Sequence, residues 1–316
     1  MPGFAVIEAP SVLGLFPRGV ERLPDALLGA GLADALDARR AGRVEPPPYD
    51  PRRDPATGLL NPTGLRDYAH QLADTTGEVL DGGEMPIVLG GDCSILLGNL
   101  LALSRRGRHG LLFLDGHADF YQPEAEPNGE AASMDLALAT GRGPSVVADL
   151  DGRGALVRDE DVVVLGRRDA EEAEAAGSRR IEDTEITVFD LPSVRERGAA
   201  RAASDAVEHL GRPDLDGFWI HVDCDVLDDA VMPAVDYRLP GGLSWDELET
   251  VLAAAIATSR AVGLELTIFN PALDTDGVII RTLVAGLGRV LGNARRLRMV
   301  RSGHSVHTRV ERRSPW

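Results

Sequence analysis

The chain has 316 residues, with 33 basic and 50 acidic side chains and a formal net charge of −17. This acidity argues against nonspecific binding to nucleic acid or to an anionic membrane, because both repel a negative protein. Two cysteines are too few for a disulfide framework, the opening MPGFAVIEAP lacks the basic region of a signal peptide, and no apolar run reaches the roughly 18 residues of a membrane span. We therefore expect a cytoplasmic globular protein.

Apolar runs of strand length alternate with segments of helical character. Most runs are continuous, as expected of strands that are buried on both faces of a sheet. The runs are Pro86–Leu89, Leu111–Leu114, Val162–Leu165, Thr187–Phe189, Phe218–Val222 and Leu264–Phe269. The helical segments are Gly64–Leu80, Ile95–Arg105, Met134–Thr140, Ala199–Leu210, Trp245–Ser259 and Gly277–Leu291, and Ser244 with Glu247 predicts a capping box for the fifth. This alternation predicts a three-layer α/β fold with helices on both faces of a mainly parallel open sheet.

Two segments have an irregular composition. Residues Glu45–Pro62 are rich in proline and glycine, which predicts a surface loop. Residues 293–316 are rich in arginine and lack a sustained apolar period, so we expect a C-terminal tail, either packed on an acidic neighbour or solvated. No repeat or linker divides the remainder, so residues 1–292 are predicted to form a single domain.

Ligand-type side chains follow three of the predicted strands, at the edge where parallel α/β sheets bind ligands. They are Asp92 and Cys93 after Leu89, then Asp115, His117 and Asp119 after Leu114, and finally Asp223, Asp225 and Asp228 after Val222. Because residues two apart in an extended segment point the same way, the alternate acids and the histidine are expected to converge. One such motif alone is as often a turn or a helix cap. Two together favour a metal site, since four crowded carboxylates repel one another unless cations such as two Mn²⁺ ions bind among them.

These motifs resemble the signatures of the arginase/agmatinase (ureohydrolase) family, whose members hydrolyse guanidino or amidino C–N bonds with two Mn²⁺ ions. Gly90-Gly91-Asp92-Cys93-Ser94 is similar to the family's Gly-Gly-Asp-His-Ser, and the acidic motifs are similar to Asp-Ala-His-x-Asp and Ser-x-Asp-x-Asp-x-x-Asp-Pro. Similar segments follow in the family order at 166–169, 240–244 and 270–271, so the resemblance spans most of the chain. It implies an arginase-like fold, a small-molecule substrate and a homo-oligomer, either a trimer or a hexamer.

The resemblance also implies roles for individual residues. The implied metal ligands are Cys93, Asp115, His117, Asp119, Asp223 and Asp225, with Asp115 and Asp223 shared by both ions. A water between the ions would lose a proton near neutral pH and attack the amidine carbon, while Asp119 steers protons to the leaving amine. His221 lies two residues before Asp223 and is expected to face the same side, beside the ligands.

Cys93 is the first departure from the family pattern, because the family has His at this position. A thiolate is a softer ligand and adds a negative charge, so the site would admit Zn²⁺ or Fe²⁺ more readily. The alternative is a neutral thiol that does not bind metal, with the first ion weak or absent. Both interpretations remain open from the sequence.

Ile268 is the second departure, because the family has a substrate-pairing Glu two residues before its Asn-Pro. Bringing a guanidinium to Ile268 would leave its charge uncompensated, at a cost of several kcal/mol. A neutral amidine, a formimino group or an amide would suit this wall better. In addition, no His occurs between residues 118 and 208, so the proton-shuttling His of arginases has no counterpart.

Glu171 and Glu174 fall where arginase-like proteins hold acids near the substrate's amino group, although a solvated acidic helix from Ala170 to Ala176 explains them equally well. Two hypotheses for the function follow. The first is a binuclear manganese hydrolase of a linear C–N bond in a small guanidino, amidino or formimino compound. The alternative is a catalytically impaired metal-binding protein of the same fold, with a structural or subunit role.

Overall fold

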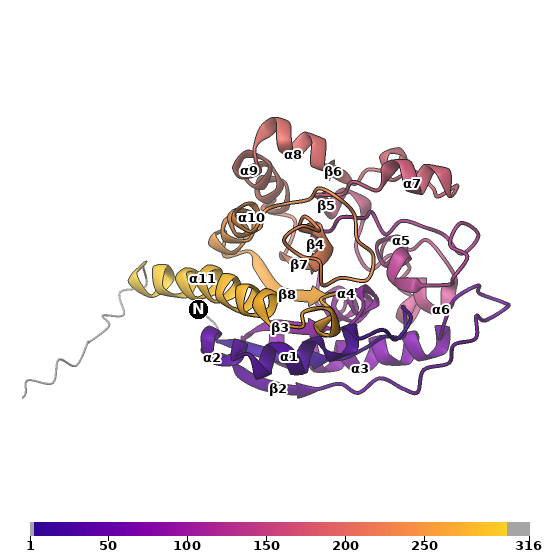
Figure 1. Ribbon diagram of the computed structural model, residues 1–316, viewed down its shortest axis with the longest axis horizontal. Helices are drawn as coiled ribbons and strands as arrows, with labels where there is room; N and C mark the ends of the chain where they lie inside the picture. The colour runs from indigo at the N-terminus through magenta and orange to yellow at the C-terminus, as the bar shows by residue number, and fades with distance from the viewer. Residues whose placement is uncertain (1–2, 302–316) are drawn as a thin grey trace, which may run out of the picture.

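The computed structural model describes the backbone of residues 3–301 and the side chains of residues 3–292. Within this part of the chain, eight parallel strands form one sheet in the order β2-β1-β3-β8-β7-β4-β5-β6. Figure 1 shows them from β2 at the bottom of the view to β6 at the top. The strands are β1 (Phe4–Ala9), β2 (Arg39–Arg43), β3 (Met85–Gly90), β4 (His109–Leu114), β5 (Val162–Leu165), β6 (Thr187–Phe189), β7 (Gly217–Asp223) and β8 (Ala261–Thr267).

Helices cover both faces of the sheet, as the sequence predicts. One apolar cluster packs the sheet against α1, α2, α9, α10 and α11, and a second packs it against α3, α4, α5 and α6. The helices are α1 (Leu23–Gly29), α2 (Leu32–Leu36), α3 (Pro62–Asp81), α4 (Leu96–Ser104), α5 (Asp135–Ala139), α6 (Ser145–Ala148), α7 (Ala170–Ala175), α8 (Leu191–Arg197), α9 (Ala199–Leu210), α10 (Trp245–Ala257) and α11 (Val278–Arg301). None of the described helices is long and apolar enough to cross a membrane.

The predicted strands correspond to β3–β8, and the sequence analysis did not predict β1 or β2. The sequence of β2 is polar, and its outward side chains are exposed. Arg40 and Arg43 of β2 both pair with Glu8 of β1, whose side chain is buried. Ion pairs thus accompany the backbone pairing of β2 with β1. An edge strand of this kind has no apolar pattern in its sequence.

Helix boundaries agree with the sequence except at the C-terminal end. The capping box of α10 is present, with the Glu247 amide donating to Ser244 Oγ at 3.3 Å and the Ser244 amide donating to Glu247 Oε2 at 2.8 Å. Helix α11 continues to Arg301, so residues 293–301 extend a helix where a tail was expected. Their arginine, leucine and alanine residues favour helix without an apolar period. Residues 302–316 of that expected tail lie outside the described residues.

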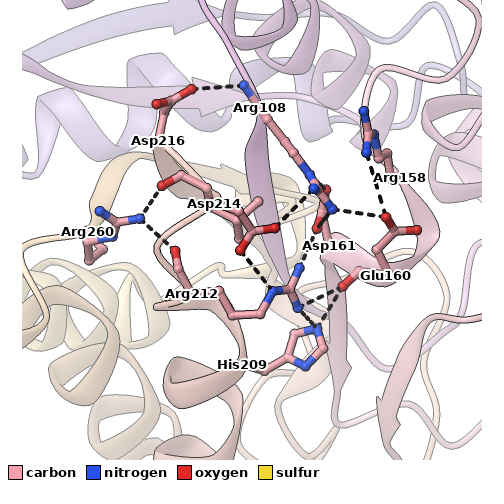
Figure 2. A network of polar contacts seen from close by, with 10 residues as sticks. Arg108, Arg158, Glu160, Asp161, His209, Arg212, Asp214, Asp216 and Arg260 are labelled. Atoms are coloured by element: carbon pink, nitrogen blue, oxygen red, sulfur yellow. Dashed lines mark hydrogen bonds and ion pairs between the residues drawn. The ribbon is translucent and has the colours of Figure 1, made fainter.

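Ion pairs and hydrogen bonds to the main chain link charged residues at the edge of the sheet where the strands begin. Arg260, Asp216, Arg108 and Asp161 each precede a strand by one residue, in the spatial order β8, β7, β4 and β5, so their charges alternate along the edge. Asp161 is buried and accepts hydrogen bonds from Arg108 at 2.7 and 2.9 Å. It also pairs with Arg212, as Figure 2 shows. We call these five residues the arginine network.

Candidate metal centre

The predicted site residues lie at the opposite edge of the sheet, where the strands end. β3, β8, β7 and β4 are consecutive in the sheet, so the segments that follow β3, β4 and β7 meet there. Cys93 begins a short turn after β3, Asp115 directly follows β4, and Asp223 is the last residue of β7. The parallel topology therefore brings together residues that are far apart in the sequence.

Eight side chains at this edge form three groups that share Cys93 or Asp115, and we call them the carboxylate cluster. Their donor atoms form three groups in which all atoms lie within 4.8 Å: Cys93, Asp115, His221 and Asp223; Cys93, Asp119 and Asp135; and Asp115, His117 and Asp225. The cluster contains every ligand implied by the family resemblance, together with two further residues, Asp135 and His221.

Unpartnered atoms in the cluster show that these residues fit a cation. Asp115 Oδ2, both carboxylate oxygens of Asp135, and His221 Nε2 are buried without a hydrogen-bond partner among the described atoms. A buried polar atom of this kind is costly unless something satisfies it. A divalent cation binds carboxylate oxygens and imidazole nitrogens, and it would satisfy Asp115 and His221 together because they belong to one donor group.

Burial and mutual repulsion disturb the protonation of the carboxylates. Burial, reinforced by the charge of Asp225, raises the pKa of Asp115 to about 6. Burial and the neighbouring carboxylates also hold the pKa values of Asp119 and Asp223 well above their usual range. A cation bound among these groups would remove the repulsion that favours their protonated forms.

His117 and Asp225 form a close pair, with Nδ1 of the imidazole 2.9 Å from Oδ2 of the carboxylate. Burial acts to lower the pKa of His117, but Asp225 and Asp115 raise it well above its usual value. Burial likewise acts to raise the pKa of Asp225, yet His117 lowers it. The Gly116 amide donates to Asp225 at 3.0 Å and holds the carboxylate in place.

Cys93 lies inside the cluster, and its sulfur belongs to two of the three donor groups. Its thiol donates to Asp223 Oδ2 at 2.8 Å and lies 3.3 Å from Thr267 Oγ1. Burial and the Asp223 carboxylate raise the pKa of this thiol well above its ordinary value. The adjacent Asp92 instead accepts the amides of Ser94 at 2.8 Å and Gly14 at 3.1 Å, so it holds the turn that presents Cys93.

A cavity of about 260 Å³ opens over the cluster. The cluster side chains that line it are Cys93, His117, Asp119, Asp223 and Asp225, and its remaining lining includes Leu15, Tyr121, Glu126, Glu130, Ala132, Glu172, Tyr237 and Ile268. Ile268 is buried, and its backbone adopts the left-handed region with φ 69°. Its amide donates to the carbonyl of Gly91 at 2.9 Å, which ties this residue to the turn after β3.

Helix α7 carries the glutamates that the sequence analysis considered as substrate contacts. Glu171, Glu172 and Glu174 are all exposed. Glu172 lines the cavity over the cluster, whereas Glu174 lines a smaller neighbouring cavity beside Arg167 and Asp169. Consecutive residues of an α-helix are rotated by about 100° about the helix axis. Residues 171 and 174 therefore share one face of α7, and residue 172 lies on another. The structure thus places Glu172 at the cavity instead of the predicted pair.

Asp135 joins the cluster although the sequence analysis interpreted it only as part of a helix. It begins α5 and is buried, and burial together with Asp115 holds its pKa well above the usual range. The available signal was a single acid within the apolar stretch that contains Met134, Leu136 and Leu138. Its proximity to Cys93 and Asp119 depends on how α5 packs, which no local pattern encodes.

The parallel sheet and the carboxylate cluster at its edge define an α/β protein with a candidate centre for divalent metal ions. A model of the arginase family matches residues 5–291. The arginase of Staphylococcus aureus (strain COL) is 28% identical over 295 residues, which cover 91% of this chain and 96% of that protein. The arginase of Bacillus caldovelox is 28% identical over 303 residues, which cover 92% and 99% of the two chains.

A solved structure gives the same result. The crystal structure of arginase from Bacillus cereus is similar with a TM-score of 0.81 at 27% sequence identity, covering 92% of this chain and 98% of that one. The chain therefore belongs to the arginase family, as its motifs predict.

Proposed function

We propose that this protein is a metal-dependent hydrolase that cleaves a linear, non-peptide C–N bond in a small guanidino, amidino or formimino compound, with two Mn²⁺ ions per chain. The observation that carries the proposal is that the carboxylate cluster contains unpartnered buried atoms and that five of its side chains line a cavity large enough for a small molecule. Membership of the arginase family supports a hydrolase.

The proposed ligands are the six that the resemblance implies, namely Cys93, Asp115, His117, Asp119, Asp223 and Asp225. Bound divalent ions would supply Lewis-acid polarisation of the substrate and a water of lowered pKa. We assign Asp119 a second role, because it lines the cavity and can carry a proton towards the leaving nitrogen. Asp225 accepts a hydrogen bond from the Gly116 amide and would orient the imidazole of His117 through their close contact.

The lining of the cavity supports a substrate with a neutral reacting group. Ile268, Leu15 and Ala132 give an apolar wall beside the cluster, where a guanidinium would find no compensating carboxylate from residue 268. Glu126 and Glu172 add negative charge to the lining, which favours an ammonium group elsewhere on the substrate. An amidine or formimino group that reacts in its uncharged form, on an amino compound, meets both requirements.

The second candidate is a catalytically impaired member of the family that retains metal for a structural or subunit role. Ile268 in the wall favours this candidate, as does the absence of any His between residues 118 and 208 of the sequence. It predicts metal binding without turnover.

The deciding experiment measures release of ammonia, urea and formamide by the Mn²⁺-loaded full chain over a panel of guanidino and formimino compounds. We expect turnover of a compound with a neutral reacting group, and a loss of at least about 100-fold in kcat for Asp119→Asn. Metal binding without release from any compound would instead support the second candidate.

Ile268→Glu tests the assignment of the wall. The new carboxylate should shift preference towards guanidinium compounds, because it supplies the missing countercharge. Ile268→Gln is the matched control, with similar size and no charge, and should leave the preference unchanged. Equal effects of the two variants on kcat/KM would contradict the assignment.

A further inference from the structure

His221 is a buried histidine in the interior of the sheet. It lies on β7, in register with Phe113 of β4 and Glu265 of β8. All three side chains are buried. An imidazole in such a place is costly unless both of its nitrogens are satisfied.

The ring of His221 is held by Glu265 and Phe113, and Glu265 is held in turn by Asn99 and Thr76. Nδ1 lies 2.6 Å from Glu265 Oε1, and the ring stacks on Phe113 with a centroid distance of 4.5 Å and an interplanar angle of 11°. The other oxygen of Glu265 accepts a hydrogen bond from Asn99, and Asn99 Oδ1 accepts one from Thr76 at 2.9 Å. Because a carboxylate only accepts, Nδ1 donates to Glu265, and Nε2 is the ring nitrogen left to bind a cation.

The Nε2 atom faces the carboxylate cluster and has no hydrogen-bond partner among the described atoms. Its nearest charged neighbour is Asp115 Oδ2 at 3.9 Å, an atom that is also buried and unpartnered. A carboxylate behind one imidazole nitrogen and an open lone pair on the other is the arrangement that orients histidine ligands in metal sites.

We propose that His221 Nε2 binds the first metal ion together with Cys93, Asp115 and Asp223, and that this site prefers Zn²⁺ to Mn²⁺. The inference rests on the proposed function and refines it: Zn²⁺ replaces Mn²⁺ at the first site, and His221 in place of Asp119 completes that site. The four donor atoms lie within 4.8 Å of one another. Tetrahedral Zn²⁺ with bonds of about 2.0–2.3 Å holds its ligand atoms roughly 3.3–3.8 Å apart. His221 Nε2 and Asp115 Oδ2, 3.9 Å apart, would move closer together, and Cys93 Sγ and Asp223 Oδ2, 2.8 Å apart, would separate as the thiol loses its proton.

Donor chemistry separates the two halves of the centre. Sulfur and imidazole beside carboxylates suit Zn²⁺, whereas carboxylates with one imidazole suit Mn²⁺. Cys93 and His221 stand together in one donor group, and Asp115, His117 and Asp225 form the other. The site with Cys93 and His221 therefore prefers the softer ion, Zn²⁺, and the site with His117 and Asp225 prefers the harder ion, Mn²⁺.

The test titrates the metal-free full chain with Zn²⁺ and, as a spectroscopic substitute, with Co²⁺. Wild-type protein should show one Zn²⁺ site much tighter than the second, with a sulfur-to-cobalt charge-transfer band. His221→Asn should weaken the tight site by more than about 100-fold and reduce the intensity of the visible cobalt bands, and Glu265→Gln should weaken it by roughly 10–100-fold. His109→Asn, at the opposite edge of the sheet, is the matched control and should change neither readout.

An unchanged Zn²⁺ affinity and cobalt spectrum in His221→Asn would overturn the inference. Circular dichroism checks folding, and if that variant does not fold, Glu265→Gln decides the question, because a change below tenfold would also overturn the inference. A wild-type chain that binds no divalent ion would overturn this inference and the proposed metal centre together. The predicted Zn²⁺ pattern without hydrolysis of any compound would support this inference and count against the proposed function alone.

Discussion

Buried acids at the two edges of the sheet have different surroundings. Where the strands begin, Asp161 is buried and pairs with Arg108 and Arg212 (Figure 2). Where they end, Asp115 is equally buried beside Asp223, Asp225, Cys93 and two histidines, no arginine pairs with it, and one of its oxygens lacks a partner among the described atoms. Acids that hold the fold together have their countercharge on the chain. Acids that lack one require it from outside, and this distinguishes a binding site from an ion-pair network.

Asp115→Asn tests the unpaired edge and should give the largest effect. The variant removes a carboxylate proposed to be shared by both ions, so we expect kcat/KM to fall by about a thousandfold or more. Metal analysis of the Mn²⁺-reconstituted protein should show fewer than two ions per chain. Retention of both ions and of activity would contradict the proposed role.

Asp161→Asn is the matched change at the paired edge. It leaves Arg108 and Arg212 without their buried partner, and we expect a loss of about 2–3 kcal/mol in the free energy of unfolding, measured with denaturant. This is less than for fully buried pairs, because the two arginine side chains are 29% and 28% exposed. The metal content should stay the same. A loss of metal would contradict the proposal that only the other edge of the sheet binds metal.

Removal of metal tests the unpaired edge as a whole. A chelator leaves the carboxylate cluster without countercharge, whereas the arginine network is unaffected. Each ion at about 100 times its dissociation constant contributes about 2.7 kcal/mol to stability, so the Tm should fall on chelation and recover with Mn²⁺. Asp161→Asn should show the same shift in Tm as the wild type. A Tm that does not respond to metal would argue against a metal centre.

His109 at the paired edge should give the smallest effect, as a pH dependence of stability. It begins β4, and burial lowers its pKa. The folded protein then binds fewer protons than the unfolded chain below the unfolded pKa of about 6.5, so stability is full above this pH and falls as the pH drops through it. His109→Asn should remove this contribution. Urea unfolding of the two metal-free proteins at pH 7.5 and 5.5 measures the difference, and identical slopes would contradict it.

Much of the fold can be predicted because burial leaves a direct pattern in the sequence. Strands β3–β8 are apolar runs since both of their faces are covered, and Ser244 marks the start of α10 through a local cap. β2 gives no such signal, because its sequence is polar and ion pairs to Glu8 accompany its pairing. Trimer or hexamer formation and a cytoplasmic location stay predictions.

The sequence predicts those site residues that lie at the ends of strands. Cys93, Asp115 and Asp223 meet because parallel strands end at one edge. Asp135 could not be placed, since its position depends on the packing of α5, and Glu172 depends on the rotation of a short helix. The direction of His221 follows from its strand, but its contact with Glu265 requires the order of β7 and β8.

Ile268 holds a branched side chain on a backbone conformation that such residues rarely adopt. A non-glycine residue in this region is strained by roughly 1–3 kcal/mol, and glycine would relieve the strain while leaving a gap in the cavity wall. Loss of a buried isoleucine side chain, however, costs about 2–5 kcal/mol, which exceeds that strain. The packing around residue 268 therefore holds its backbone in an unfavourable conformation, and a smaller residue there would lower the heat resistance of the protein as well as widen the cavity.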